Sequence, residues 1–118
     1  PGVMAIHEAM RTHPQYVWGT NEPGVQVARV THGRVIVKTG AEGFIVAYVP
    51  AQGIALAVKI ADGEPRGRVP ALLALLAAAG MISAEESRAL AHLGEPAVVD
   101  SAGKQVGCLR ACVHALPS

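Results

Sequence analysis

The chain has 118 residues, a length that fits one small domain, and 51% of them are apolar, enough to build a buried core. Ten basic residues balance nine acidic ones without forming a basic block, so the electrostatic footprint of a nucleic-acid-binding protein is absent. The longest apolar run, VPALLALLAAAGMI at 69–82, is too short to span a bilayer and predicts a buried helix instead of a membrane anchor.

The N-terminal quarter of the chain predicts a helix followed by a loop. Residues 2–17 place apolar side chains at near-helical spacing, and Pro14 predicts that the helix ends near His13, because proline lacks an N–H to donate. Residues 18–26 are punctuated by glycine, asparagine and proline, which predicts a loop.

Three extended segments come next and predict a sheet. They are rich in β-branched and other apolar residues, and each break between them is short and contains glycine or proline, so consecutive antiparallel pairing is expected. Because nearly every position is apolar, we expect helices to bury both faces of this sheet. The segments are GRVIVKTG (33–40), GFIVAYVPA (43–51) and GIALAVKIAD (53–62).

The C-terminal half predicts a turn at 61–69, a helix at 70–80, a second helix at 83–93 and a hairpin with a Ser-Ala-Gly turn in the tail. Gly80 and Gly94 suit the two helix C-termini, and Ser83 followed by Glu86 forms a capping box. The whole predicts an α/β fold in which helices flank an antiparallel sheet. Residues 1–118 form either a single domain or the C-terminal part of a larger one.

Lys38 stands in the strongest candidate for chemistry, at the end of the first strand. An ammonium among buried apolar strands is desolvated, which disfavours its charged form and equips it to take a proton from a hydroxyl. Gly40 and Gly43 leave room for a substrate to approach the backbone, whose N–H groups stabilise an oxyanion. Glu42 is placed to hold a substrate ammonium or to orient Lys38. The alternative is a charged pair in an ordinary turn, with glycines for geometry.

Four stretches, in order, resemble a known family. They are the opening IHEAMRTHPQYVWGT, the segment VKTGAEG, the strand ALAVKIADG with Arg66 after it, and the terminal AGKQVGCLR. Together they resemble the C-terminal part of the bacterial L-asparaginase II family of the rhizobial type. The pattern K-x-G-A-E-G followed at this distance by KIADG is far more specific than Lys-Thr-Gly alone. The resemblance implies a fold similar to serine β-lactamases, penicillin-binding proteins and glutaminases.

The resemblance also implies a Ser/Lys amidohydrolase without a cofactor. A serine attacks the side-chain amide of asparagine, and the acyl-enzyme is hydrolysed to aspartate and ammonia. Lys38 matches the catalytic lysine of the strand motif, for proton transfer or attraction of the substrate carboxylate. Thr39 is expected to hydrogen-bond that carboxylate, and Glu42 to meet the substrate ammonium or Lys38. Gly40 and Gly43 frame the substrate site. The preference between asparagine and glutamine stays open.

This sequence departs from the family pattern in its nucleophile. The Ser-x-x-Lys motif at the start of a buried helix, Cys-Ser-Gly-Lys-His and Asp-Gly-Cys of the family are missing. Ser101 and Lys104 have the Ser-x-x-Lys spacing, but they lie in a predicted turn, where we expect solvated residues. We therefore expect the nucleophile on an upstream segment or a partner chain, and a homodimer or other oligomer to cover the exposed sheet edge. The alternative is a non-catalytic binding or scaffold piece of that fold.

Two further patterns are weighed against simpler interpretations. Cys108, Cys112 and His114 point to one side of a strand, yet they lack the tight paired spacing typical of zinc, so we expect structural thiols and no metal. Two cysteines without a recognisable signal peptide predict a reduced, cytoplasmic protein. Pro1 would suit the amine base of a tautomerase, but such enzymes open on a strand, whereas this chain opens on a helical pattern.

Overall fold

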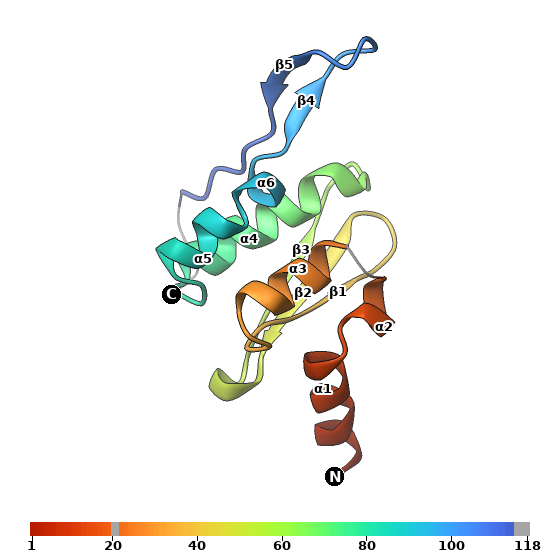
Figure 1. Cartoon of the computed structure of the whole chain (residues 1–118), viewed down its shortest axis with the longest axis vertical. Helices are drawn as coiled ribbons and strands as arrows, with labels where there is room; N and C mark the ends of the chain where they lie inside the picture. Colours follow the sequence, from red (N-terminus) through yellow and green to blue (C-terminus); the bar gives the residue numbers. More distant parts are fainter. Residues whose placement is uncertain (20–21, 115–118) are drawn as a thin grey trace.

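The computed structural model describes residues 1–19 and 22–114, and this part of the chain has a mixed α/β architecture (Figure 1). A three-stranded and a two-stranded antiparallel sheet are flanked by helices, as the sequence predicts. In chain order the elements are α1 (Gly2–Thr12), α2 (Gln15–Trp18), α3 (Pro23–Val30), β1 (Ile36–Thr39), β2 (Phe44–Val49), η1 (Pro50–Gln52), β3 (Ile54–Lys59), η2 (Pro65–Gly67), α4 (Arg68–Ala78), α5 (Ala84–Ala89), α6 (Ala91–Gly94), β4 (Ala97–Val99) and β5 (Gln105–Cys108).

The strand order β1-β2-β3 confirms the predicted consecutive pairing. Lys38 pairs with Val46, and Val46 pairs with Ala57, so these three residues share one face of the sheet. The other members of each face follow from the alternation along the strands. The inner face carries Val37, Thr39, Ile45, Ala47, Val49, Ile54, Leu56 and Val58, and the outer face carries Ile36, Lys38, Phe44, Val46, Tyr48, Ala55, Ala57 and Lys59.

Only the inner face is sealed, so the expectation that helices bury both faces is wrong. On the outer face Ala55 and Ala57 are exposed, and β3 has no fully buried residue. Helix α1 reaches this face at one end, where the His7 ring lies 4.9 Å from the Tyr48 ring between centroids. A continuous apolar run therefore does not require two-sided burial here, because small alanines account for much of the apolar character of β3.

Helix α3 was not predicted. The expected loop over 18–26 is wrong for residues 23–26, which form the first turn of this helix, and Trp18 belongs to α2. Pro23 stands at the first helical position, where its missing N–H costs nothing, and Val25 and Ala28 point into the protein. A proline beside a glycine indicates a loop in most contexts, and here the helix is stabilised by the burial of its apolar side.

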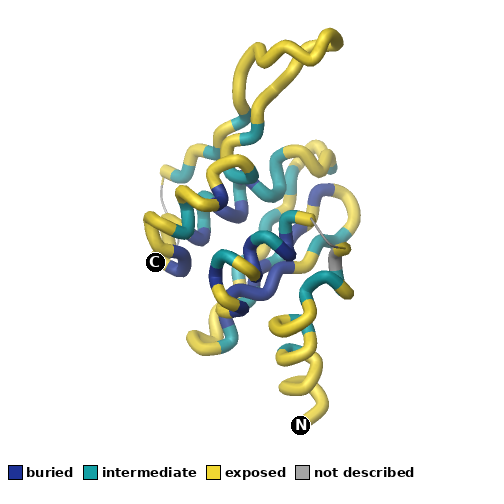
Figure 2. The backbone as a smooth tube through the Cα atoms, in the orientation of Figure 1, coloured by how far each residue is buried: buried dark blue, intermediate teal, exposed yellow. Residues whose placement is uncertain are grey.

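The core joins the inner face to α3, α4 and the segment that holds α5 and α6. Figure 2 shows the buried residues concentrated on the sheet and on α3 and α4, whereas α1 and the β4–β5 hairpin are largely exposed. The largest side chains with almost no exposed surface include Leu72 and Leu76 of α4, Leu90, Val25 and Ile45. Aromatic residues are scarce, so aliphatic side chains provide this packing.

The predicted end of α4 at Gly80 and the predicted start of α5 after Ser83 are confirmed, but α4 begins at Arg68, before the predicted start at residue 70, and the helix predicted over 83–93 is divided into α5 and α6. The N–H of Met81 donates to the Leu76 carbonyl at 2.9 Å, closing α4 next to Gly80, whose φ of +72° suits glycine. The predicted capping box begins α5: the Glu86 N–H donates to the Ser83 hydroxyl at 3.0 Å, and the Ser83 N–H donates to the Glu86 carboxylate at 2.8 Å.

Glu86 also links α5 to the segment before β1. The Arg34 guanidinium donates to both carboxylate oxygens of Glu86, at 2.6 and 2.5 Å, and to the Met81 carbonyl at 3.3 Å. Burial raises the pKa of Glu86, but hydrogen bonds from the Ser83 N–H and from Arg34 outweigh it and hold the pKa of Glu86 below its usual value.

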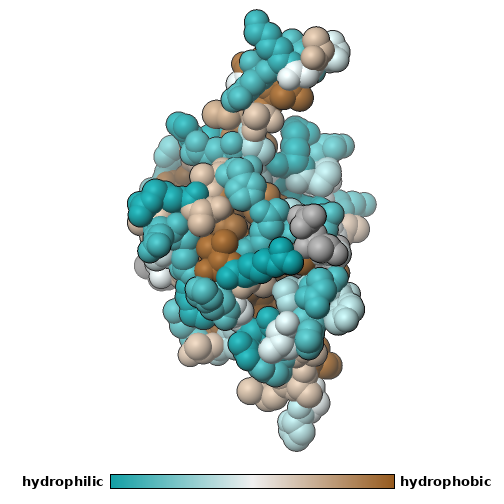
Figure 3. Space-filling view, viewed as in Figure 1, coloured by the Kyte–Doolittle hydropathy of each residue, from teal (hydrophilic) through white to brown (hydrophobic). Residues whose placement is uncertain are grey.

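The predicted C-terminal hairpin is present as β4 and β5 and projects from the body of the protein (Figure 1). Asp100 organises its turn, because the carboxylate accepts hydrogen bonds from the N–H groups of Ala102 and Lys104, both at 2.9 Å. Apolar side chains on this arm are exposed, among them Val99 and Val106, and Figure 3 shows apolar atoms on it.

Among residues 1–19 and 22–114, no helix has both the length and the apolar character needed to cross a bilayer.

We expect Leu76→Ala to lower the free energy of unfolding by roughly 2–5 kcal/mol, because the truncation leaves a cavity in a site with no exposed surface. Leu75→Ala is the matched control, since Leu75 is only half-buried on the same helix and should cost clearly less. Urea unfolding followed by circular dichroism measures both. Equal losses would show that the inner-face core does not govern stability.

We expect Glu86→Gln to flatten the acid dependence of stability. A carboxyl whose pKa is depressed in the folded state stabilises the protein above its unfolded pKa, near 4.5, and that contribution is lost as the pH falls through the folded pKa. Glutamine preserves the capping box, so the variant isolates the charge. The urea midpoints of the parent protein and of Glu86→Gln should converge as the pH falls from about 5 to about 3. A difference that stays constant across this range would contradict the expectation.

Candidate active site

Lys38 lies on the outer face of the sheet, near the end of β1. Its neighbours across the sheet are Val46, which is half-buried, and Ala57, which is exposed. The Lys38 residue is itself exposed, so the desolvation expected from its apolar strands is not provided by the residues that the structure describes. The lysine therefore stands on an open apolar surface rather than inside a cavity.

The turn after Lys38 is closed by backbone hydrogen bonds. The Gly40 N–H donates to the Phe44 carbonyl at 2.9 Å, and the Phe44 N–H donates to the Ala41 carbonyl at 3.3 Å. Because Gly40 and Phe44 form a hydrogen-bonded pair, the alternation of antiparallel ladders directs the backbone groups of Thr39 away from β2. Thr39 thus presents backbone groups along the edge of β1 that pairs with no other strand among the described residues, where an oxyanion donor is expected.

Gly43 is required by packing within the protein. It is buried with a φ of +73°, and a Cβ there would lie 2.9 Å from the Ile60 Cβ and 3.1 Å from the Glu64 carbonyl oxygen. A Cβ on Gly40 would meet the Phe44 ring at 2.7 Å. The space that was expected to admit a substrate is thus occupied by the chain itself at both glycines.

Glu42 pairs with Lys59 and not with Lys38. The Lys59 ammonium lies 3.8 Å from a Glu42 carboxylate oxygen and also donates to the Glu42 carbonyl. The Glu42 side chain is 85% exposed, and its φ of +56° is unusual for a residue other than glycine. A ligand can therefore reach the Glu42 carboxylate. Binding it there would break only the weak surface ion pair with Lys59.

The turn after β3 supports the Lys38 turn from the other side. Asp62 accepts a hydrogen bond from the Glu64 N–H at 2.9 Å and pairs with Arg66 at 2.7 Å. The hydrogen bond from Glu64 and the charge of Arg66 lower the pKa of Asp62 despite some desolvation. Ile60 donates its N–H to the Gly43 carbonyl at 3.1 Å, and Arg68 reaches the Gly40 carbonyl at 3.5 Å.

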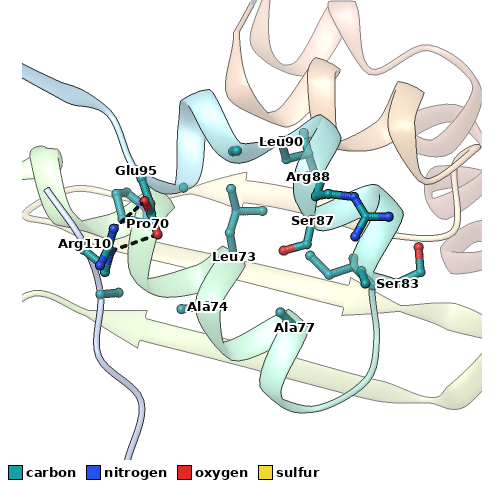
Figure 4. Close-up of a pocket in the computed structure, with 15 residues that line it drawn as sticks. Pro70, Leu73, Ala74, Ala77, Ser83, Ser87, Arg88, Leu90, Glu95 and Arg110 are labelled. Atoms are coloured by element: carbon teal, nitrogen blue, oxygen red, sulfur yellow. Dashed lines mark hydrogen bonds and ion pairs between the residues drawn. The ribbon is translucent and has the colours of Figure 1, made fainter. Parts of the chain in front are cut away.

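A groove of about 630 Å³ lies on the other side of the protein, between α4, α5, α6 and the C-terminal tail (Figure 4). Its floor is apolar and includes Leu73 and Ala77, and the Ser87 hydroxyl and the ion pair between Glu95 and Arg110 lie at its rim. No residue of the Lys38 turn lines it. Sequence reasoning missed this groove, because its walls come from three helices whose mutual packing leaves no motif.

The remaining candidates occupy exposed positions. Ser101 and Lys104 lie at the tip of the β4–β5 hairpin, in the turn that the sequence predicts and far from any buried helix start. Within the described ranges no three His, Cys, Asp or Glu side chains gather to hold a metal ion. Pro1 is exposed and precedes α1, so the chain opens on a helix as expected.

A family model covers most of the chain. The family model of L-asparaginase II matches residues 2–111, which include every strand and the whole Lys38 turn. None of the curated proteins compared with the chain matches it.

We expect Gly43→Ala to destabilise the fold more than Gly53→Ala. Both glycines have a left-handed backbone, so either alanine costs about 1–2 kcal/mol of strain. Only Gly43 adds a clash with Ile60 and Glu64, worth roughly a further 1–3 kcal/mol, whereas nothing lies within 4 Å of a Cβ at Gly53. Thermal unfolding of the two variants measures the difference. Similar melting temperatures would mean that the two turns are not packed together.

Proposed function

Since the family model matches residues 2–111, the chain belongs to the L-asparaginase II family, and from this we propose that it forms one wall of an asparaginase-type amidohydrolase site. The reaction is hydrolysis of the asparagine side-chain amide to aspartate and ammonia through an acyl-enzyme on a serine. The observation that carries the proposal is the match itself, because it runs through the strand pair and the turn that hold Lys38.

The nucleophilic serine comes from a segment or chain outside residues 1–118. Ser101, which alone has a lysine three residues later, lies exposed in a hairpin turn without a buried neighbour to position it. Ser83 caps α5 with its hydroxyl, on the side of the protein that carries the groove. A serine delivered from elsewhere is consistent with the open outer face, onto which a further element can pack.

Covering the outer face would change the state of Lys38. Val46 and Ala57 beside it offer an apolar surface, so a packed element would remove the ammonium from water and equip it for proton exchange with a hydroxyl. The oligomer or partner chain that we propose for this protein would act here. The two free thiols, Cys108 and Cys112, fit a reducing cytoplasm.

The turn residues take complementary roles in this proposal. The backbone N–H of Thr39 at the edge of β1 binds the substrate carboxylate or the developing oxyanion, because the Thr39 side chain lies on the inner face with Ile45, opposite to Lys38. Glu42 receives the substrate ammonium by exchanging its weak pair with Lys59. Gly40 and Gly43 act indirectly, because they let the turn that follows Lys38 close tightly.

A non-catalytic role as a binding or scaffold piece is the second candidate. The exposure of Lys38 favours it, and that residue lines neither the groove beside α4 nor the small pocket beside Ile36. In that case the chain would keep the geometry of the turn without a nucleophile to complete the reaction.

Ammonia release from asparagine and glutamine tests the proposal. The chain is assayed alone and joined to whatever coding sequence precedes it in its gene. We expect release only in the longer protein, and a loss of about 10²–10⁴-fold in kcat on Lys38→Ala. Lys104→Ala, at the exposed hairpin tip, is the matched control and should leave the rate unchanged.

Lys38→Arg separates the two roles of the lysine. Arginine keeps the positive charge but does not give up its proton, so retained activity would indicate carboxylate attraction and lost activity proton transfer. Unaltered turnover in Lys38→Ala would remove this residue from the reaction. No ammonia release from the longer protein would leave the scaffold role.

A further inference from the structure

The C-terminal tail after β5 lies along the body as an extended strap. No helix or strand is formed over residues 109–114, yet burial alternates along them: Leu109, Ala111 and Val113 are half-buried. Figure 1 shows this stretch running back from the hairpin past α4, and Ala111 lines the groove. The strap is thus a wall of the groove and not a free tail.

Two polar contacts hold the strap in place. The Leu109 N–H donates to the Pro96 carbonyl at 2.9 Å. The Arg110 guanidinium donates to both carboxylate oxygens of Glu95, at 3.0 and 3.1 Å. Both groups of this ion pair are about half exposed or more, so the pair is screened and contributes little stability. The strap is therefore attached weakly enough to be released.

The alternation places Cys108, Arg110 and Cys112 on the solvent side of the strap. Both cysteines are free and exposed. Arg110 is near both sulfur atoms, and the hydrogen bond and charge of Glu95 are the largest causes that raise the pKa of Arg110. A guanidinium between two accessible thiols attracts anionic reagents.

We propose that Cys108 and Cys112 form a dithiol modification site for low-molecular-weight disulfides that carry carboxylates. One thiolate attacks a sulfur of the small disulfide, giving a mixed disulfide and releasing one small thiolate. The other cysteine, as thiolate, attacks the protein sulfur of that mixed disulfide and releases the second small thiolate. The protein dithiol is oxidised to a Cys108–Cys112 disulfide, and the small disulfide is reduced to two thiols.

This disulfide is incompatible with the strap. Four residues of extended chain span about 13–14 Å, whereas a disulfide joins Cα atoms about 4.4–6.8 Å apart. Closure therefore coils residues 109–111, which withdraws Ala111 from the groove and strains the bond between Arg110 and Glu95. Oxidation releases the strap and opens the groove, and reduction restores it.

The experiment treats the full chain with oxidised glutathione and follows it by mass spectrometry and hydrogen exchange. We expect the main product to lack two hydrogen atoms without a glutathione adduct, and exchange to rise in 109–113 and in α4 beside the groove. Dithiothreitol should reverse both changes. Stable mixed disulfides, intermolecular dimers as the main product, or unchanged exchange in the oxidised chain would each overturn the proposal.

Matched variants assign each step. Cys108→Ser and Cys112→Ser should stop at a single adduct, with no rise in exchange along α4. Glu95→Gln should accelerate ring closure several-fold, because it loosens the strap without touching a thiol. In the Cys112→Ser background, Arg110→Gln should slow the first adduct several-fold. Equal rates in Glu95→Gln and the parent would show that the strap does not restrain the dithiol.

Discussion

The inner face of the β1–β2–β3 sheet is sealed by aliphatic side chains, with Leu72 and Leu76 of α4 almost completely removed from water. Burying each such leucine contributes about 1.5–3 kcal/mol, and few aromatic residues are available to replace them. The position of α4 against β2 and β3, and the attachment of α5 through Arg34 and Glu86, follow from this packing.

The same packing decides where the candidate catalytic lysine points. Val37 belongs to the inner face, so Lys38, its neighbour in β1, must point outward. A shift of β1 by one residue would exchange the two, but it would also move Val37 out of the core. The outward direction of Lys38 is thus enforced by the core, and a chemical role for it depends on what covers the outer face.

Local signals predicted most of the fold. The structure confirms the three consecutive strands, the end of α4 at Gly80 and the capping box of Ser83 and Glu86. Each was predicted from residues that lie close together in the chain. Helix α3 escaped prediction because Pro23 begins a helix as well as it breaks one. The groove beside α4 also escaped, because it arises between helices that have no shared sequence pattern.

The candidate site was also predicted only in part from the sequence. Resemblance pointed to the turn at 38–43, and the family match covers it. The partner of Glu42 could not be anticipated, because Lys59 reaches it only through the pairing of β2 with β3. The packing around Gly43 was hidden for a similar reason, since Ile60 and Glu64 approach it from the following turn.

By itself, then, the sequence determined the family, the order of helices and strands, and the turn that carries Lys38, because periodicity, caps and motifs act over short distances along the chain. The tertiary structure alone decided that one sheet face stays open, that Glu42 faces Lys59, and that the tail forms a wall of the groove. Those features depend on contacts between residues far apart in the chain, and such contacts are settled by packing and burial rather than by local preference.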